Sequence, residues 1–307
     1  MSDIRLSAAS RQIEQAILDP KLRPVVQTFF DETTFTATHI AHDPATRKAV
    51  IIDSVLDYDP ASGRTQNTSA HRVLNYIQEN NLVVEWQLET HAHADHLSAA
   101  VWLKEKLGGR IAIGENITHV QDAFGKIFNA EKNFSRDGSQ FDKLFHDGET
   151  FSVGSLPAIA LSVPGHTPAD MVYIIGDAAF IGDTLFMPDY GTARADFPGG
   201  DARQLYRSIQ RLLSLPDKTR VFLCHDYKTA DRHEFRWETT IGDERNNIHV
   251  HDGVSEDQFV SMRTSRDKTL SLPHLIMPSV QVNMRAGHLP EPEENGVSYI
   301  KIPVNRM

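Results

Sequence analysis

Three histidines and an aspartate lie within six residues, in the run His91-Ala92-His93-Ala94-Asp95-His96. Imidazole and carboxylate groups are common ligands of zinc and iron, and a metal site needs several of them together. The preceding residues 82–89 are rich in apolar side chains and predict a buried strand, and a helical pattern follows from Leu97 to about Leu107. The run is therefore predicted at a strand-to-helix turn, where open α/β sheets place their ligand-binding residues.

The spacing of the run suits one metal or two neighbouring metals. On an extended backbone, side chains alternate between the two faces, so His91, His93 and Asp95 are expected to point the same way. His96 points elsewhere unless the chain turns. We therefore expect two groups of ligands, one on each side of the turn.

Three further apolar runs that predict strands end in a residue able to bind a metal. These are His166 after residues 158–163, Asp183 after residues 178–181, and His225 after residues 221–223. Burying a carboxylate after an apolar strand is costly unless a metal or a hydrogen-bond donor satisfies it. Singly, His166 is also explained as a turn histidine and Asp183 as an Asx turn. Four strand ends that carry such residues predict one shared metal centre.

The order of these motifs resembles the metallo-β-lactamase superfamily over roughly residues 25–230. The resemblance implies an α/β fold, a four-layer αββα sandwich with its metal site at one edge between the two sheets. In two-metal members, His91, His93 and His166 would bind one metal, Asp95, His96 and His225 the other, and Asp183 would bridge them. The commonest β-lactamases use a cysteine at the second metal. Here Cys224, the single cysteine, is expected on the opposite face from His225, which favours the glyoxalase II-like branch.

A narrower resemblance is to the persulfide dioxygenases, the family of the ethylmalonic encephalopathy protein. Besides the metal motifs, it rests on the segments Gly191-Thr192-Ala193-Arg194-Ala195-Asp196-Phe197, His225-Asp226-Tyr227 and Asn283-Met284-Arg285-Ala286-Gly287. It implies one Fe(II) per chain, held by His91, His166 and Asp183, with coordination positions left open for oxygen and substrate. His93, Asp95, His96 and His225 would then orient these ligands.

The resemblance implies oxidation of glutathione persulfide, or a similar small persulfide, to sulfite and thiol in sulfur metabolism. From motif position, Arg194, Tyr227 and Arg285 are the candidates to bind the carrier, although Arg194 could simply pair with Asp196. The alternative is a glyoxalase II-type thioester hydrolase with one or two zinc ions. It stays open because the two-metal ligand set is complete. The charged stretch 228–270 is also longer than we expect in the compact members of the persulfide dioxygenase family.

Composition narrows the class of protein. The 307 residues include 41 acidic and 31 basic side chains, a net charge of −10, so we expect no nucleic-acid partner. No apolar run is long enough to span a membrane, and a single cysteine fits a reducing cytoplasm. The expected partners are a small thiol or persulfide and O₂, and a homodimer is left open. We expect a helical extension over residues 1–24, the metal-binding domain over 25–235, and a C-terminal extension packed on it over 236–307.

Hydrophobic periodicity and turn residues predict several further elements. Residues 33–53 are expected to form a hairpin, and residues 69–80 a helix that buries Val73, Leu74 and Ile77. Residues 120–134 are expected to form a helix and a loop. Two further helices are expected over 201–213, with Asp201 as the cap, and over 255–264, with Ser255 as the cap. Residues 292–304 are expected to form a loop and a strand.

Overall fold

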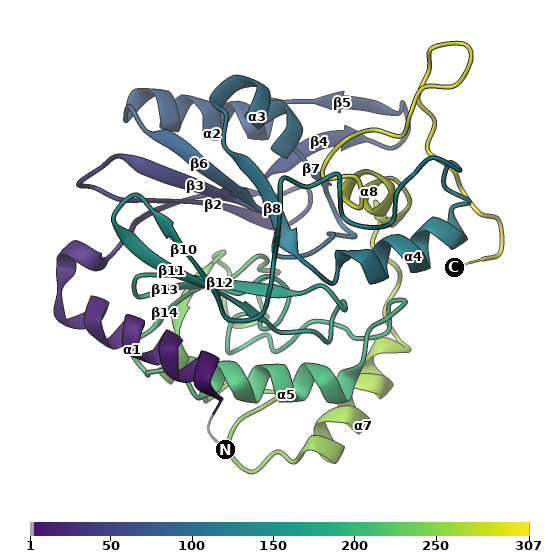
Figure 1. The fold of residues 1–307 in the computed structure, drawn as a ribbon. Helices are drawn as coiled ribbons and strands as arrows, with labels where there is room; N and C mark the ends of the chain where they lie inside the picture. The colour runs from purple at the N-terminus through teal and green to yellow at the C-terminus, as the bar shows by residue number, and fades with distance from the viewer. Residues whose placement is uncertain (1–2, 307) are drawn as a thin grey trace.

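Two six-stranded β-sheets lie face to face, and helices cover the outer face of each (Figure 1). The computed structural model describes residues 3–306. The first sheet has the order β1 (Val25–Asp31), β2 (Thr36–His42), β3 (Lys48–Ile52), β6 (Val83–Leu88), β8 (Arg110–Gly114), β9 (Lys143–Phe145). The second has the order β10 (Glu149–Val153), β11 (Leu156–Ser162), β12 (Met171–Ile175), β13 (Ala178–Phe180), β14 (Arg220–Phe222), β15 (Glu238–Thr240). A small third sheet joins β5 (Arg64–Gln66), β4 (Val55–Asp59) and β7 (Leu97–Ser98).

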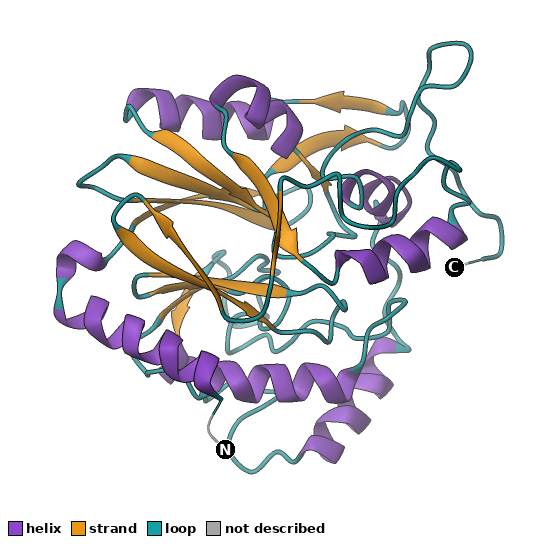
Figure 2. Ribbon diagram, viewed as in Figure 1, coloured by secondary structure: helices purple, strands orange, loops and turns teal. Residues whose placement is uncertain are grey.

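The helices lie on both outer sides of the sheet pair, which confirms the predicted αββα sandwich (Figure 2). Helices α2 (Thr68–Glu79) and α3 (Ala100–Leu107) pack on the first sheet, and α1 (Ile4–Leu18) and α5 (Ala202–Leu213) pack on the second. The other helices are the short η1 (Pro20–Leu22), α4 (Ile117–Ile127), α6 (Ile241–Glu244), α7 (Glu256–Asp267) and α8 (Ile276–Asn283).

Side-chain alternation along the strands builds the layers. In β3, Ala49 and Ile51 pack against α2 and α3, whereas Val50 and Ile52 face the second sheet. Strand β11 divides its side chains in the same way between α1 and the space between the sheets. Because both faces of these strands are buried, they are apolar almost throughout, as expected for a central sheet with a cover on each side.

Most elements expected from periodicity are present. Helix α2 buries Val73, Leu74 and Ile77, and the β2–β3 hairpin joins as predicted. Asp201 and Ser255 cap α5 and α7 through side-chain hydrogen bonds, and Ser255 forms a capping box with Gln258.

Helix α4 covers residues 117–127 and a loop follows it, as expected for residues 120–134, although the helix begins three residues earlier. Two expectations about elements are wrong. Residues Leu97–Ser98 form strand β7 and pair with β4, so the helix begins only at Ala100. Within the described chain, residues 292–304 form no strand.

Residues 236–306 contribute a strand and helices that pack on the sandwich. Strand β15 extends the second sheet by pairing with β14, and α7 packs on α5. Helix α8 contacts β7 next to the His91–His96 run.

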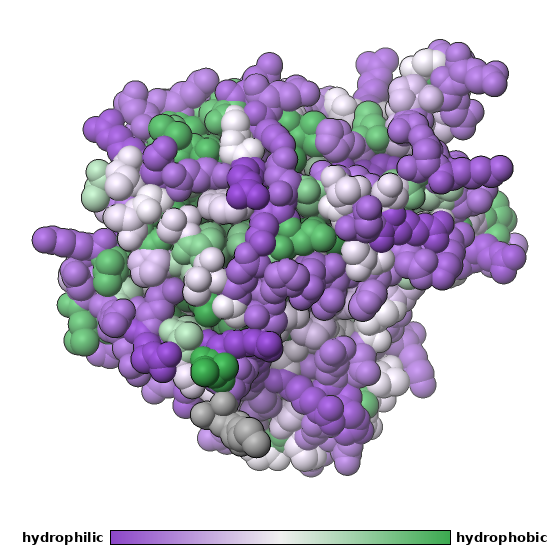
Figure 3. Space-filling model, viewed as in Figure 1, coloured by the Kyte–Doolittle hydropathy of each residue, from purple (hydrophilic) through white to green (hydrophobic). Residues whose placement is uncertain are grey.

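The viewed surface is mostly hydrophilic, with small separate apolar patches (Figure 3). In the described part of the chain, no helix has the length and apolar character to cross a membrane.

The buried carboxyl of Glu244, at the end of α6, makes stability depend on pH. Burial raises its pKa to about 8, against a hydrogen bond from Asn247 that lowers it. Between pH 4.5 and 8 the unfolded chain releases this proton and the folded protein keeps it, so the free energy of unfolding falls as pH rises. At about 1.4 kcal/mol per pKa unit the upper limit of this pH-dependent change is about 5 kcal/mol, and we expect about 2 kcal/mol.

Urea unfolding of Glu244→Gln at pH 5 and pH 8.5 measures this effect. The variant should lose most of the pH-dependent decrease and become more stable than the wild type at pH 8.5. The exposed Glu238 on β15 gives the control, because its carboxylate stays in water. Identical pH slopes for the wild type and Glu244→Gln would contradict the assignment.

Candidate metal centre

The predicted ligands all lie at the edge where the two sheets meet. The His91–His96 run leaves β6 as an irregular loop and ends at β7. His166 lies between β11 and β12, Asp183 follows β13, and His225 follows β14. The backbone N–H of Thr90 and the Thr90 hydroxyl both donate to the Asp53 carboxylate after β3, at 2.8 Å each. This double hydrogen bond fixes the start of the loop.

The seven side chains form one continuous cluster. Potential ligand atoms of His91, His166 and Asp183 lie within 4.8 Å of one another, and so do those of His93, Asp95 and His96. His225 links the two groups, because its Nε2 lies 3.3 Å from Asp183 Oδ1 and 3.5 Å from Asp95 Oδ2. His91 groups with His166 and Asp183, and its ring centroid also lies 4.0 Å from that of His93. The run does not continue the extended backbone of β6, which ends at Leu88, so simple alternation does not apply to it.

Each of the five imidazoles has one nitrogen held by a protein group. The pairs are His91 Nδ1 with Thr90 Oγ1 (3.1 Å), His93 Nε2 with Asp53 Oδ1 (2.9 Å), His96 Nδ1 with Asp95 Oδ2 (3.1 Å), His166 Nδ1 with the Arg194 carbonyl (2.7 Å) and His225 Nδ1 with the Phe35 carbonyl (2.9 Å). Carboxylate and carbonyl partners of this kind orient imidazole ligands in metal proteins.

The opposite nitrogens point into the cluster. Among residues 3–306, buried atoms without a hydrogen-bond partner include His91 Nε2, His93 Nδ1, His96 Nε2, His225 Nε2 and Asp183 Oδ1. Leaving so many buried polar atoms unsatisfied is costly, and one or two bound cations would offer them partners. The donor set of imidazoles and carboxylates therefore fits iron or zinc.

The hydrogen bonds also determine the form of His91. The Thr90 hydroxyl donates its only hydrogen to Asp53, so it accepts from His91 Nδ1–H, which leaves Nε2 as a lone-pair donor. Burial, together with His93 and His166 nearby, holds the pKa of His91 well below its ordinary value. His91 is thus neutral, which is the form that binds metals. At His93, burial lowers the pKa, but the Asp53 carboxylate outweighs it and raises the pKa well above the ordinary value.

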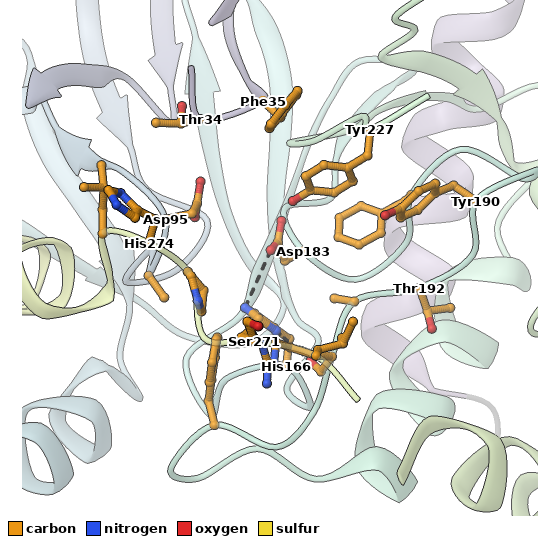
Figure 4. Close-up of a pocket in the computed structure, with 18 of the residues that line it drawn as sticks. Thr34, Phe35, Asp95, His166, Asp183, Tyr190, Thr192, Tyr227, Ser271 and His274 are labelled. Atoms are coloured by element: carbon orange, nitrogen blue, oxygen red, sulfur yellow. Dashed lines mark hydrogen bonds and ion pairs between the residues drawn. The ribbon is translucent and has the colours of Figure 1, made fainter. Parts of the chain in front are cut away.

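A cavity of about 520 Å³ opens beside the cluster, a size typical of small-molecule sites. Asp95, His166 and Asp183 line it, whereas His91, His93, His96 and His225 are buried behind them. Figure 4 shows Tyr190 and Tyr227 on one side of Asp183 and His274 on the other. Aromatic rings form much of the wall, from Phe35, Phe186, Tyr190, Phe197 and Tyr227.

The three residues expected to bind the carrier have different positions. Arg194 and Tyr227 line the cavity. Arg194 also makes the anticipated bidentate ion pair with Asp196, at 2.6 and 2.8 Å. Arg285 does not line the cavity: it is buried, lies over the Phe134 ring and pairs with Glu131 at 2.5 Å. We therefore withdraw the substrate-binding role expected for Arg285.

Cys224 also departs from expectation. It is buried, and its sulfur lies within 4.8 Å of ligand atoms of His93 and His225, so it does not face away from the centre. Strand β14 ends at Phe222, and alternation does not extend to Cys224.

Sequence reasoning missed two residues that hold the loop. Asp53 carries the same signal as Asp183, a carboxylate directly after an apolar strand, and could have been found. Asn283 donates to the carbonyls of His93 and His96 and accepts from the Ser98 N–H. Nothing local in the sequence indicates these contacts.

Comparison with known proteins agrees with this architecture. Residues 45–225 match the family model described as the metallo-beta-lactamase superfamily. The chain belongs to this superfamily. It is 55% identical to a Burkholderia pseudomallei protein named a probable metallo-hydrolase, over 91% of this chain and 99% of that protein. It is 49% identical to glyoxylase B2 of Dictyostelium discoideum, over 91% of this chain and 97% of that protein.

The chain is also similar to persulfide dioxygenases and to an ETHE1 structure. Human mitochondrial persulfide dioxygenase ETHE1 is 27% identical over 94% of this chain and 98% of its own length. The crystal structure of ETHE1 from Myxococcus xanthus superposes with a TM-score of 0.68 at 31% identity, covering 86% of this chain and all of that chain. The chain is thus a metal-dependent enzyme of this superfamily, whose relatives include both glyoxalase-like and dioxygenase members.

Proposed function

We propose that the protein is an iron-dependent persulfide dioxygenase. The observation that carries the proposal is the set His91, His166 and Asp183, whose potential ligand atoms lie within 4.8 Å of one another beside the cavity. Two histidines and one carboxylate are the usual ligands of non-haem iron oxygenases. The substrate would be glutathione persulfide or a similar small persulfide, and the products sulfite and the thiol.

The reaction balances without a further oxidant. The S–S bond breaks, the terminal sulfur ends as sulfite with two oxygen atoms from O₂ and one from water, and the carrier leaves as the thiol. Iron(II) held by the three residues would supply the oxygen activation. The chain's own residues set the geometry. The Arg194 carbonyl accepts from His166 Nδ1–H, so Nε2 faces the centre, and Thr90 does the same for His91.

The cavity wall suits a thiol carrier. Tyr227 packs against Tyr190 and Phe186 with ring centroids 5.2 and 5.6 Å apart, and it stacks on His225 at 5.8 Å. The phenylalanine and tyrosine rings among these line the cavity and would offer a flat apolar surface to the carrier. The relation to human persulfide dioxygenase and the similarity to the Myxococcus structure support the same reaction class.

A specific observation favours one alternative, a glyoxalase II-type thioester hydrolase. His93, His96 and His225 each carry a buried nitrogen without a partner in residues 3–306, and these three side chains would complete the ligand set for two metals. Two zinc ions could then lower the pKa of a bridging water to near neutrality for attack on a thioester. The 49% identity to glyoxylase B2 is consistent with this reading.

Metal counting with two assays separates the functions. The protein is purified without oxygen, its metals are counted, and oxygen uptake with glutathione persulfide and cleavage of a glutathione thioester are measured. We expect one iron per chain, with one O₂ consumed per sulfite formed. Two zinc ions per chain with thioester cleavage and no oxygen uptake would falsify the dioxygenase proposal.

A further inference from the structure

One wall of the cavity comes from the C-terminal part of the chain, outside the residues 45–225 that match the family model. It consists of the end of α7 and the segment that follows. Its cavity-lining residues are Arg263, Arg266, Leu270, Ser271, Pro273, His274 and Leu275. Below, "C-terminal wall" denotes residues 263–275. None of these residues belongs to the metal cluster.

Buried hydrogen bonds hold the C-terminal wall against the segment that carries Arg194. Arg263 and Asp267 form a buried ion pair at 2.6 Å on one face of α7. Arg263 also donates to the Thr192 carbonyl at 2.9 Å, and Asp267 accepts from the Ala195 N–H at 3.0 Å. A buried pair with its remaining hydrogen bonds satisfied fixes one geometry. The end of α7 is therefore held firmly in place at the cavity.

The arginines that line the cavity differ in whether their guanidinium groups already have partners in the protein. Arg194 is occupied by Asp196 and by the Ser271 carbonyl, and Arg263 by Asp267. Arg266 is exposed and makes no ion pair or side-chain hydrogen bond with any residue from 3 to 306. The carboxylates that line the cavity are Asp95 and Asp183, both in the metal cluster. Arg266 thus offers a free cation to whatever enters the cavity.

Building on the proposed function, we propose that Arg266 binds a carboxylate of the thiol carrier, so that the substrates are persulfides of carboxylate-bearing thiols such as glutathione. A guanidinium matches a carboxylate with two parallel hydrogen bonds. The aromatic side of the cavity would receive the apolar part of the carrier, and the metal cluster its sulfur. His274, also on the C-terminal wall, is a further polar side chain that lines the cavity.

Binding of reduced glutathione, measured by calorimetry, tests the carboxylate contact without requiring turnover. We expect Arg266→Ala to weaken binding by about 10-fold or more, since hydrogen bonds to charged groups are among the strong ones. Arg266→Lys should retain part of the affinity. The dimethyl ester of glutathione should bind the wild type and Arg266→Ala equally. The matched control is Lys268→Ala, an exposed cation two residues away that does not line the cavity.

Kinetics distinguish this inference from the proposed function. With glutathione persulfide, Arg266→Ala should raise KM by about 10-fold and change kcat by less than about two-fold, because Arg266 is not among the proposed metal ligands. An absence of oxygen uptake by the wild type, with Arg266-dependent glutathione binding, would overturn the dioxygenase proposal and leave the carboxylate contact supported. Equal glutathione affinity in the wild type and Arg266→Ala, or no glutathione binding by the wild type, overturns the carboxylate contact.

Discussion

Replacing His166 with alanine is expected to remove metal and activity together, whereas His225→Ala should keep most of its iron. His166 is one of the three ligands in the proposed mononuclear site, and His225 only supports Asp183. Supporting residues typically change metal affinity by about 10–100-fold, and a lost ligand should cost more than about 100-fold. Iron content after dialysis against a graded chelator, together with oxygen uptake, measures both variants.

The two substitutions are closely matched. Both side chains are buried, and each donates one ring nitrogen to a backbone carbonyl, that of Arg194 for His166 and that of Phe35 for His225. Each alanine variant therefore loses the same number of atoms and the same kind of hydrogen bond. A difference in metal content between them reports the role of the remaining nitrogen. Equal loss of metal in the two variants would instead favour a dinuclear centre.

The clustering of the candidate metal ligands could be predicted because its signal is local. A polar ligand directly after an apolar strand is visible in the sequence at His166, Asp183 and His225, and the sheets bring these strand ends to one edge. Helix caps such as Asp201 and Ser255 are equally local. Asp53, directly after β3, carries the same local signal.

What could not be predicted depends on contacts between distant residues. The two-residue strand at Leu97–Ser98 exists only because it pairs with β4. The orientation of Cys224 depends on where β14 ends, and strand ends are not fixed by alternation alone. Arg285 forms an ion pair with Glu131, 154 residues earlier in the chain. No periodic pattern in the sequence indicates this pairing. A motif position therefore identified a conspicuous arginine without indicating what it contacts.

The Asn283→Ala variant should fold but bind metal poorly. The Asn283 side chain uses both amide hydrogens and its oxygen on the metal loop: it donates to the His93 carbonyl at 2.9 Å and the His96 carbonyl at 2.8 Å, and accepts from the Ser98 N–H at 2.8 Å. Its removal leaves three buried backbone groups unsatisfied, at about 1–3 kcal/mol for each group that water does not reach. We expect the free energy of unfolding to fall by about 3 kcal/mol.

The effect on the metal follows from the position of these contacts. Asn283 fixes the backbone of His93 and His96, and the loop also carries His91, so its loss should loosen a proposed ligand without removing it. The expected decrease in metal affinity is about 10–100-fold, the range typical of residues that orient ligands. Excess iron should therefore restore oxygen uptake in Asn283→Ala, whereas it should not restore His166→Ala.

Helix α8 provides the control for this variant. Ser279 lies on the same helix, is fully buried, and its hydroxyl makes no hydrogen bond with residues 3–306. Ser279→Ala therefore removes a buried side-chain oxygen from α8 without releasing the metal loop, and its metal affinity should equal that of the wild type. If Ser279→Ala and Asn283→Ala lose metal to the same degree, the effect belongs to the packing of α8. A loss confined to Asn283→Ala assigns it to the three hydrogen bonds, which tie the C-terminal helix to the metal loop.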